Sequence, residues 1–277
     1  MITFGCLLAV VGMASVADEP KPDVGFVAKG ETLPNAVVTS DGDVNRLKPL
    51  LESLPDGHKL ELEFVTVPKS LTGYKDDLRY ARRVTAVDAA GKPDGLEIEF
   101  HNWYQPPIRK TTYKHGVRDG VEELFHPSTD QKQSEIPWKA GLIEGVKKTY
   151  HANGVVAGET PYVGGKTQGE AKAFTAKGAL LRKVRFVDGK RDGESVDYWP
   201  DSGDKVDRVI PYRKGMVDGV SRAFYLDGKP KWEKPFRNNL QHGVEKQFAP
   251  DGMLERERHW IDGDAVSAEE FQAKYKP

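Results

Sequence analysis

The sequence has little of what catalytic, metal-binding and nucleic-acid-binding proteins usually need. Its 277 residues include one cysteine, Cys6. A disulfide framework or a thiolate metal site in the body of the chain is therefore excluded. The charges nearly cancel, with 41 basic and 42 acidic residues and a net charge of −1. Because nucleic-acid binding normally requires a basic face, we expect no nucleic-acid partner.

Catalytic and cofactor motifs are missing as well. No Gly-x-Ser-x-Gly motif occurs, and the glycine pairs precede strand-like segments, whereas phosphate-binding glycine loops precede a helix. The seven histidines show no metal-ligand spacing and are expected to be solvated at turns and strand ends: His58, His101, His115, His126, His151, His242 and His259. We therefore expect no catalytic residue, no cofactor and no metal site.

One continuous apolar segment lies at the N-terminus. Phe4 to Val16 is apolar apart from Ser15, and small residues at Ser15 and Ala17 precede the polar Asp18, although no basic residue comes first. This pattern resembles a secretory signal peptide over residues 1–17 and predicts an exported protein, whether periplasmic, envelope-associated or secreted. No later run approaches the roughly 18 apolar residues that a membrane span needs. No transmembrane span is predicted in the mature chain.

The next part of the chain predicts little regular structure. Residues 18–36 carry several Pro and Lys residues and predict a flexible leader, and residues 37–83 predict a small α+β region. Within that region, Val37–Thr39 is expected to form a short strand. The strict alternation of Leu60-Glu61-Leu62-Glu63-Phe64 predicts a half-buried strand.

A short helix is predicted within 37–83. Asp43 is expected to cap a helix that runs to about Ser53, with an apolar face made of Leu47, Leu50 and Leu51. Pro49 disfavours the middle of this helix.

The same stretch offers a weaker calcium hypothesis. Asp41, Asp43 and Asn45 alternate, and Glu52 occupies the twelfth position, as in a calcium-binding loop. Such a loop needs glycine at its sixth position, where this chain has Arg46. The helix is therefore preferred to a calcium site.

The rest of the chain is a repeat. A leading glycine, a second glycine four positions later and an aromatic five positions after that recur at intervals of 24–26 residues. Such a fixed period is the signature of a repeat architecture and predicts about seven repeats over residues 84–263. The leading glycines are Gly91, Gly116, Gly141, Gly165, Gly189 and Gly215, with Asn239 as a substitute and Gly263 opening an eighth unit. The second glycines, assigned a structural turn role, are Gly95, Gly120, Gly145, Gly169, Gly193, Gly219 and Gly243. The first aromatics, also assigned a structural role, are Phe100, Phe125, Tyr150, Phe174, Tyr198, Phe224 and Phe248.

Each unit predicts one β-hairpin. After the second glycine, the first, third and fifth residues share one face, and we expect this aromatic side to be the packed side. Dipeptides such as Asn153-Gly154 and Asp227-Gly228 are typical of two-residue turns, in which both positions need positive φ. A return strand then ends in a second aromatic: Tyr113, Trp138, Tyr162, Phe186, Tyr212, Phe236 and Trp260.

Proline indicates how the hairpins are joined. It precedes four of the second aromatics, as Pro137, Pro161, Pro211 and Pro235. Because proline donates no ladder hydrogen bond, the ladder is expected to be interrupted there. The fold class predicted is mainly β: an elongated, single-layered, antiparallel hairpin stack that does not close into a barrel.

The chain is expected to end in a helix within residues 264–277. Ser267-Ala268-Glu269-Glu270 forms a capping box, and Val266 and Phe271 can form a hydrophobic staple. A short helix through Tyr275 would cover the open end of the sheet, as terminal repeats require.

These phrases resemble the MORN repeat variant, a family whose bacterial members include YwqK-type antitoxins. The residues from Gly165 to Phe186 fit its pattern fully, and those from Gly141 to Tyr162 and from Gly189 to Tyr212 do so too. The pattern departs at Asn239 and lacks the turn glycine at 103–108 and 126–131. The resemblance implies a non-catalytic scaffold that binds proteins or surface polymers.

Two groups of side chains admit a second interpretation. Carboxylates precede the second glycine at Asp119, Glu144, Asp192 and Asp218, where a glycosidase pair is conceivable. A bond to nearby turn amides is the favoured role. The aromatic columns could stack on sugars or lipid tails, but packing of the rings against one another is favoured.

The favoured function is an exported, non-enzymatic scaffold that binds a protein or a cell-envelope component. The alternative is an antitoxin-like protein that neutralises a toxin partner. A hydrolase using residues 18–83, or a calcium-binding protein, is a weaker alternative.

Overall fold

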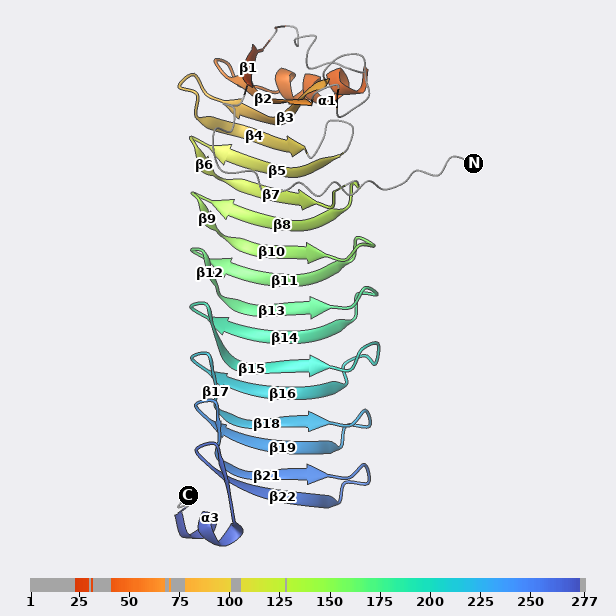
Figure 1. The fold of residues 1–277 in the computed structure, drawn as a ribbon, viewed down its shortest axis with the longest axis vertical. Coiled ribbons are helices and arrows are strands. Elements are labelled where there is room, and N and C mark those ends of the chain that lie inside the picture. Colours follow the sequence, from red (N-terminus) through yellow and green to blue (C-terminus); the bar gives the residue numbers. More distant parts are fainter. Residues whose placement is uncertain are drawn as a thin grey trace, which may run out of the picture.

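The computed structural model describes residues 23–29, 31, 41–67, 70, 78–100, 106–127 and 129–274. The predicted signal peptide and the strand predicted at Val37–Thr39 lie outside them. The described strands form one 23-stranded sheet, accompanied by two described helices, α1 (Asp41–Glu52) and α3 (Ala268–Lys274). Strands that follow one another in the chain pair antiparallel, so the sheet is a meander that stacks along one axis (Figure 1). The predicted open, mainly β hairpin stack is confirmed.

The N-terminal strands are β1 (Asp23–Ala28), β2 (Lys59–Val67), β3 (Leu78–Val87), β4 (Pro93–Phe100) and β5 (Pro107–Lys114). The central strands are β6 (Val117–Arg118), β7 (Gly120–Phe125), β8 (Lys132–Lys139), β9 (Leu142–Ile143), β10 (Gly145–Tyr150), β11 (Val156–Val163), β12 (Lys166–Thr167), β13 (Gly169–Phe174) and β14 (Leu180–Val187). The C-terminal strands are β15 (Lys190–Tyr198), β16 (Val206–Arg213), β17 (Met216–Val217), β18 (Gly219–Phe224), β19 (Pro230–Arg237), β20 (Leu240–Gln241), β21 (Gly243–Phe248), β22 (Leu254–Ile261) and β23 (Asp264–Val266).

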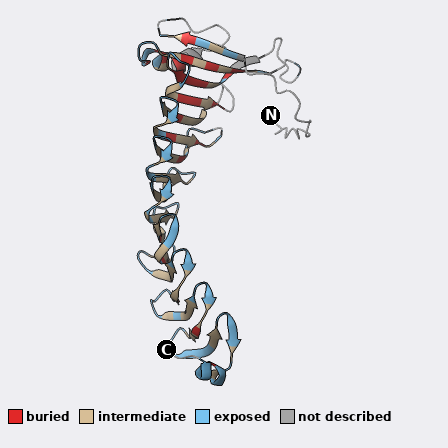
Figure 2. Ribbon diagram, turned by 90° about the vertical axis from the view of Figure 1, so that its left-hand side faces the viewer, coloured by how far each residue is buried: buried red, intermediate tan, exposed pale blue. Residues whose placement is uncertain are grey.

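The N-terminal end holds the hydrophobic core of the molecule. Helix α1 contributes Leu47 and Leu51, which lie four positions apart and therefore on one side of the helix. They pack with Leu62, Val84 and Ile98, which lie opposite one another on β2, β3 and β4. Buried residues concentrate at this end and give way to half-buried and exposed ones along the repeats (Figure 2).

Two predictions for this end need correction. Residues 23–28 belong to the segment predicted as a flexible leader, but they form β1, because their backbone completes the ladder on β2 and Val27 is buried in the core. The predicted helix is confirmed, but it begins at Asp41, so Asp43 lies inside it rather than at its cap. Pro49 is accommodated within it.

The two-residue turns of the repeats lie at the opposite end of the hairpins from the one predicted. At Asn153-Gly154 only the glycine has a positive φ, and His151 bonds to Val155 across a three-residue loop. Residues 178, 228 and 252 close the same kind of loop, a type I turn followed by one glycine in the left-handed region. The two-residue turns with two positive φ values lie at the leading glycines, as at Ala140-Gly141 (φ 48° and 80°).

The second glycine forms a bulge against the preceding unit. Tyr162 pairs with Thr167 and Glu159 with Lys172, so residues 160–161 face the longer segment 168–171. At the equivalent Gly243, φ is +126°, and a Cβ atom would lie 2.8 Å from Cγ of Pro235. Glycine is required here for both reasons.

The recurrent prolines face these bulges. The carbonyl of Pro161 accepts a hydrogen bond from Gln168 of the next unit, and Pro137, Pro211 and Pro235 do the same. Because the N–H and C=O of one strand residue point to the same neighbour, the proline nitrogen also points to the bulge. The predicted interruption of the ladder is confirmed at this position.

The C-terminal helix is confirmed as α3. The N–H of Glu270 donates to Oγ of Ser267 at 3.1 Å, as a capping box requires. Phe271 is buried and packs its ring on His259 of β22 at a centroid distance of 5.0 Å. The end of the sheet is covered only in part, since β23 pairs with His259–Ile261 and not with the rest of β22.

Candidate binding surfaces

The sheet of the repeats has two faces, and the register assigns each side chain to one of them. We call the face that bears Ile98 the helix face, because α1 covers it at the N-terminal end. The opposite side is called the open face. The first, third and fifth residues after each second glycine lie on the helix face, and the second and fourth lie on the open face.

The expectation of one packed aromatic side is wrong. The first aromatics lie on the helix face, whereas the second aromatics lie on the open face, because each pairs with a second glycine, as Trp138 does with Gly120. On the helix face Val121 is 48% exposed, while Glu122 on the open face is 4% exposed. Each face therefore carries one aromatic column, and the open face encloses its central residues more closely.

The rings of a column do not stack on one another. From Pro107 to Lys274, the described residues include one ring pair, His259 with Phe271. The physical reason is spacing: two strands per unit separate equivalent rings by about 9–10 Å, which exceeds the distance over which aromatic rings interact directly. The favoured prediction of ring-on-ring packing is wrong. Each second aromatic instead lies opposite a second glycine in the register of its hairpin.

A row of cross-strand neighbours runs along the helix face. It continues the apolar row Leu62–Val84–Ile98 beyond the helix and becomes charged at Lys110. The row is Lys110, Glu123, Glu135, Lys148, Glu159, Lys172, Lys183, Val196, Val209, Arg222, Glu233, Lys246 and Glu257. Opposite charges in directly opposed positions stabilise a sheet and keep its face soluble.

Where two acids are adjacent in this row, a third group compensates them. Nζ of Lys132 lies 2.6 Å from Oε1 of Glu123 and 2.5 Å from Oε1 of Glu135. The Lys132 contact, followed by the hydroxyl of Tyr150 at 2.7 Å, lowers the pKa of Glu135. Burial, together with the bond to Glu135, raises the pKa of Tyr150 to about 12. The group is a structural ion cluster in which each charge has a partner.

The charged row is broken once, at Val196 and Val209. Beside this break the helix face holds a hollow of about 350 Å³, which we call the apolar hollow. Val206, Val209, Phe224 and Leu226 line it, with Lys205 and Asp227 at its rim. Leu226 is 51% exposed, so the hollow presents apolar surface to solvent.

The open face carries buried acids that sequence reasoning missed. Glu97, Glu122 and Glu245 all lie two residues after a second glycine, and each is less than one-tenth exposed. Glu122 and Glu245 each accept a bond of 2.9 Å from the indole N–H of a second aromatic, Trp138 and Trp260. The shared offset from the glycine was the available signal. Because each acid anchors an aromatic, its role is structural.

A second hollow lies on the open face, where small residues replace these acids. It measures about 330 Å³ and lies over Ala171 and Ala173, between the rings of Tyr162 and Phe186. Arg182 lines it and is paired with Asp197. The second aromatics of this part of the sheet thus stand beside open space.

The largest of these cavities, about 510 Å³, lies where α1 meets the first repeats. Its lining includes Leu50, Leu96 and Tyr113, together with the pair His58 and Asp94. Nε2 of His58 lies 3.0 Å from Oδ2 of Asp94, and the two side chains are 16% and 20% exposed. This contact raises the pKa of His58 and lowers that of Asp94.

The carboxylates before the second glycines do not act within their own turn. Asp119 accepts from the N–H of Ala140 at 3.1 Å, Glu144 from that of Gly164 at 2.7 Å, and Asp192 from that of Lys214 at 3.0 Å. Each therefore bonds to the two-residue turn of the next unit. The structure spreads these acids one per unit along the edge, so it does not bring them together as a glycosidase pair.

The leading glycines complete this linkage between units. The N–H of Gly141 donates to the carbonyl of Arg118, and Gly165, Gly189, Gly215 and Gly263 repeat the bond at 2.8–2.9 Å. At the opposite edge, the Tyr225 hydroxyl donates to the carbonyl of Phe248 at 2.9 Å. Both edges of the sheet are therefore tied from one unit to the next.

Not all of the described histidines are solvated as predicted, and two of them, His58 and His115, contact the same carboxylate oxygen of Asp94 at 3.0 and 3.7 Å. His58 and His242 have side chains that are 16% and 15% exposed, because each faces an aspartate. Within the described ranges, no group of three or more His, Cys, Asp or Glu residues could hold a metal ion. The segment of the calcium hypothesis is helical from Asp41 to Glu52, which differs from a calcium-binding loop.

Comparison with known families agrees with this geometry. Residues 143–163 and 241–262 match the model described as MORN repeat variant. Each match spans one hairpin, from β9 to β11 and from β20 to β22. The resemblance noted in the sequence is confirmed at these two places, and MORN repeats suggest a repeat scaffold. No curated protein matches the chain. Neither described helix is long and apolar enough to cross a membrane.

Proposed function

We propose that this repeat scaffold is non-enzymatic and binds a protein partner through the apolar hollow on its helix face. The observation that supports this most is the single break in the charged row. Elsewhere the row is charged, which suits contact with water, but Val196 and Val209 interrupt it, and Val209 lines the hollow together with Phe224 and the exposed Leu226. Exposed apolar surface rimmed by polar residues is typical of interaction sites.

The charges around the hollow favour a partner with acidic residues beside its apolar anchor. Lys172 and Lys183 precede the break in the row, and Arg222 follows it. Lys172 and Arg222 contact Glu170 at 3.7 Å and Glu233 at 3.1 Å, and no acid lies within 4.0 Å of Lys183 among the described residues. A partner carboxylate near Lys183 would complete the row.

Affinity capture tests this function. The full chain, immobilised, is expected to retain a specific protein, and Val209→Glu should abolish that retention by placing a charge in the hollow. Val163→Glu provides the matched control, because Val163 is 56% exposed and lies outside the hollow. Equal capture by all three proteins would contradict the proposal, and retention of an envelope polysaccharide instead would favour a polymer ligand.

We also propose that the protein is exported. The apolar segment Phe4–Val16 and the small residues before Asp18 support this. A reporter fused to the first 25 residues should leave the cytoplasm. A reporter that stays in the cytoplasm would contradict export and favour the antitoxin-like alternative suggested by the family resemblance.

A further inference from the structure

The hollow on the open face lies where a small residue replaces a long one. In three units, the second residue after the second glycine is a buried acid, and two of these acids, Glu122 and Glu245, bond to the indole of a second aromatic. In the unit of β13 and β14, the equivalent residue is Ala171, whose side chain ends at Cβ. The hollow of about 330 Å³ over Ala171 and Ala173 is therefore space that a side chain fills elsewhere. We call it the open-face hollow, and its volume lies within the range of ligand pockets.

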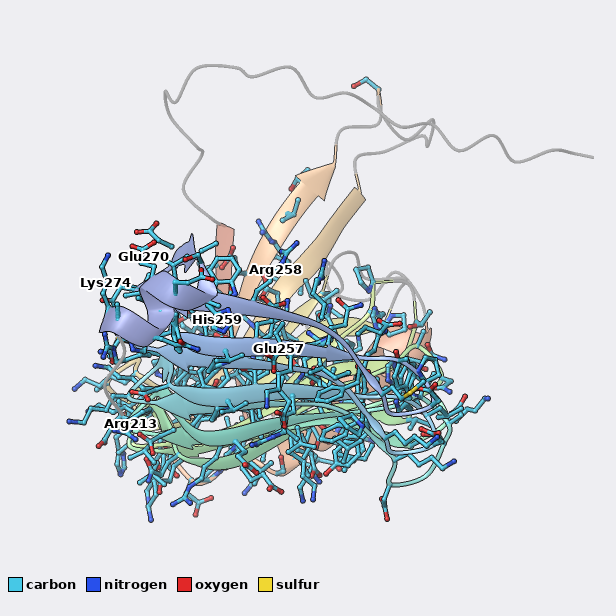
Figure 3. The ribbon with its side chains drawn as sticks, turned by 90° about the horizontal axis from the view of Figure 1, so that it is seen from below. Arg213, Glu257, Arg258, His259, Glu270 and Lys274 are labelled. Atoms are coloured by element: carbon cyan, nitrogen blue, oxygen red, sulfur yellow. The ribbon has the colours of Figure 1, made fainter. Side chains whose placement is uncertain are left out.

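Two second aromatics flank the open-face hollow. Tyr162 on β11 and Phe186 on β14 line it, and β13 runs between their strands. Figure 3 looks along the stack and shows the side chains of the repeats projecting from both sides of the sheet. Two strand spacings separate the rings by about 9–10 Å. Because a group that packs on a ring lies about 3.5–4 Å from it, the space accepts one flat ring in contact with both aromatics.

The open-face hollow also has polar groups whose hydrogen-bonding capacity is not used. Nε of Arg182 contacts Asp197, and the two terminal nitrogens of this guanidinium have no other hydrogen-bond or ion-pair partner among the described residues. The hydroxyls of Thr160, Tyr162 and Thr167 also line the hollow and form no hydrogen bond with any other residue that the structure describes. Donors and acceptors are therefore available beside two apolar rings.

This combination disfavours several classes of ligand. A lipid tail would cover the hydroxyls and the guanidinium without replacing their bonds to water, which is costly. A peptide backbone would find no main-chain partner, because the main-chain groups of a sheet point to neighbouring strands and not out of its face. The charge of Arg182 is already balanced by Asp197, so the ligand need not be ionic.

A sugar ring meets each requirement of the open-face hollow. One face of a pyranose consists of weakly positive C–H groups, which pack on the negative face of an aromatic ring. Its hydroxyls both donate and accept, so they match a guanidinium donor and neighbouring hydroxyls at the same time.

We propose that the open-face hollow binds a neutral pyranose sugar, either free or as one unit of a glycan. The sugar ring packs between Tyr162 and Phe186. Its hydroxyls accept from the terminal nitrogens of Arg182 and exchange hydrogen bonds with Thr160 and Thr167. The inference goes beyond the proposed function, because it concerns another ligand and the opposite face of the sheet.

The first test measures binding of sugars to the full chain by isothermal titration calorimetry. The probes are hexasaccharides of glucose, mannose, galactose and N-acetylglucosamine, together with the four monosaccharides. At least one hexasaccharide should bind with a stoichiometry of one. If the matching monosaccharide binds as tightly, the ligand is a free sugar, and if it binds at least tenfold more weakly, the ligand is a glycan. No detectable binding of any probe would overturn the inference.

The second test removes one flanking ring. Phe186→Ala should weaken binding of the sugar at least tenfold, because one of the two packing surfaces is lost. Phe236→Ala is the matched control, since Phe236 is also a second aromatic but lies outside the open-face hollow, and it should leave the affinity unchanged. Equal affinity in Phe186→Ala and the parent chain would refute the inference.

A third variant fills the hollow and leaves both rings in place. Ala171→Gln adds a side chain of the length found at Glu122 without its charge, and it should abolish binding of the sugar. It answers the same question if Phe186→Ala does not fold. Unchanged affinity in folded Ala171→Gln would place the sugar elsewhere and contradict the inference.

Two exchanges of variants separate this inference from the proposed function. Val209→Glu should leave binding of the sugar unchanged, because Val209 lines the apolar hollow on the helix face. Ala171→Gln should leave capture of a protein partner unchanged. Loss of sugar binding in folded Val209→Glu would contradict the inference, whereas failure to capture a protein would contradict only the proposed function.

Discussion

The two ends of one side-chain row are stabilised in different ways. Under α1 the row is apolar, and Leu62 and Val84 are fully buried. Beyond Lys110 the same row is charged, and no described helix covers it before α3. The N-terminal part therefore depends on burial, whereas the repeats depend on their backbone ladder, their bulges and the bonds between units. Whether a helix covers the row therefore decides which side chains the row carries: apolar ones under α1 and charged ones beyond it.

The contrast also concerns function. A covered row cannot meet a partner, whereas an uncovered one must carry charge to stay soluble. Against that charged background, the break at Val196 and Val209 stands out. The apolar hollow that we propose for binding lies where the charged pattern of the row is interrupted.

The largest effect is expected for the covered core. Leu62→Ala should lower the free energy of unfolding by about 2–5 kcal/mol, because it leaves a cavity among close-packed side chains. Val196→Ala, on the uncovered part of the same row, should cost less than about 1.5 kcal/mol, since the site is only partly buried. Urea unfolding measures both. Equal losses would remove the distinction between the two ends.

The bulge glycines give the next largest effect. Gly243→Ala should destabilise the repeats by about 1–3 kcal/mol, because its φ is +126° and its Cβ would meet Pro235 at 2.8 Å. Gly228→Ala, with φ +88° and open space around its Cβ, should cost only about 1 kcal/mol. Thermal melting compares the two. Adding Pro235→Ala should relieve part of the Gly243→Ala loss, and an unchanged loss would contradict the steric account.

The bonds between units should contribute less per residue. Asp119→Ala removes the acceptor of the Ala140 N–H and should cost about 0.5–1.5 kcal/mol. Asp119→Asn keeps an amide oxygen, as Gln168 does naturally at the equivalent place, and should retain most of the stability. Amide exchange at Ala140 reports the bond directly. Equal protection of that amide in Asp119→Ala and the parent chain would show that the bond does not contribute.

The smallest effect on stability is expected from the pair His58 and Asp94, which lies where the N-terminal core meets the first repeats. The raised pKa of His58 means that its contribution is complete below its ordinary pKa of 6.5 and is lost as the pH rises through the folded value. The lowered pKa of Asp94 means that its contribution is present above 3.8 and is lost as the pH falls. The pair should therefore stabilise most between about pH 4 and 6.5.

An NMR titration of the His58 imidazole checks this expectation. Its pKa should lie above 6.5, and Asp94→Asn should bring it back toward that value. A His58 pKa that is insensitive to Asp94→Asn would show that the contact does not form in solution.

Periodicity was sufficient to predict the hairpin stack, because two glycines and two aromatics recur where strands begin and end. The face on which each aromatic lies and the type of each turn were harder to predict, because the bulge at each second glycine depends on the strand of the preceding unit. Asn-Gly and Asp-Gly dipeptides suggested two-residue turns, but the strand register makes those loops one residue longer. The partners of Asp119 and Glu144 lie in the next unit, beyond the reach of local turn rules.

The binding surfaces were harder still to predict. The apolar hollow depends on Val196 and Val209 being neighbours across two strands, which only the register reveals. The buried Glu97, Glu122 and Glu245 share a fixed offset from the second glycine, and that offset was visible in the sequence. Their burial was not, because it follows from the enclosure of the open face.

The central claim is that both faces of the repeats are open to solvent, and cysteine labelling tests it directly. In a Cys6→Ser background, Lys246→Cys on the helix face and Gln247→Cys on the open face should both react rapidly with a thiol reagent, whereas Ile98→Cys beneath α1 should react slowly. Strong protection of either Lys246→Cys or Gln247→Cys would show that a second layer covers that face and would contradict the account.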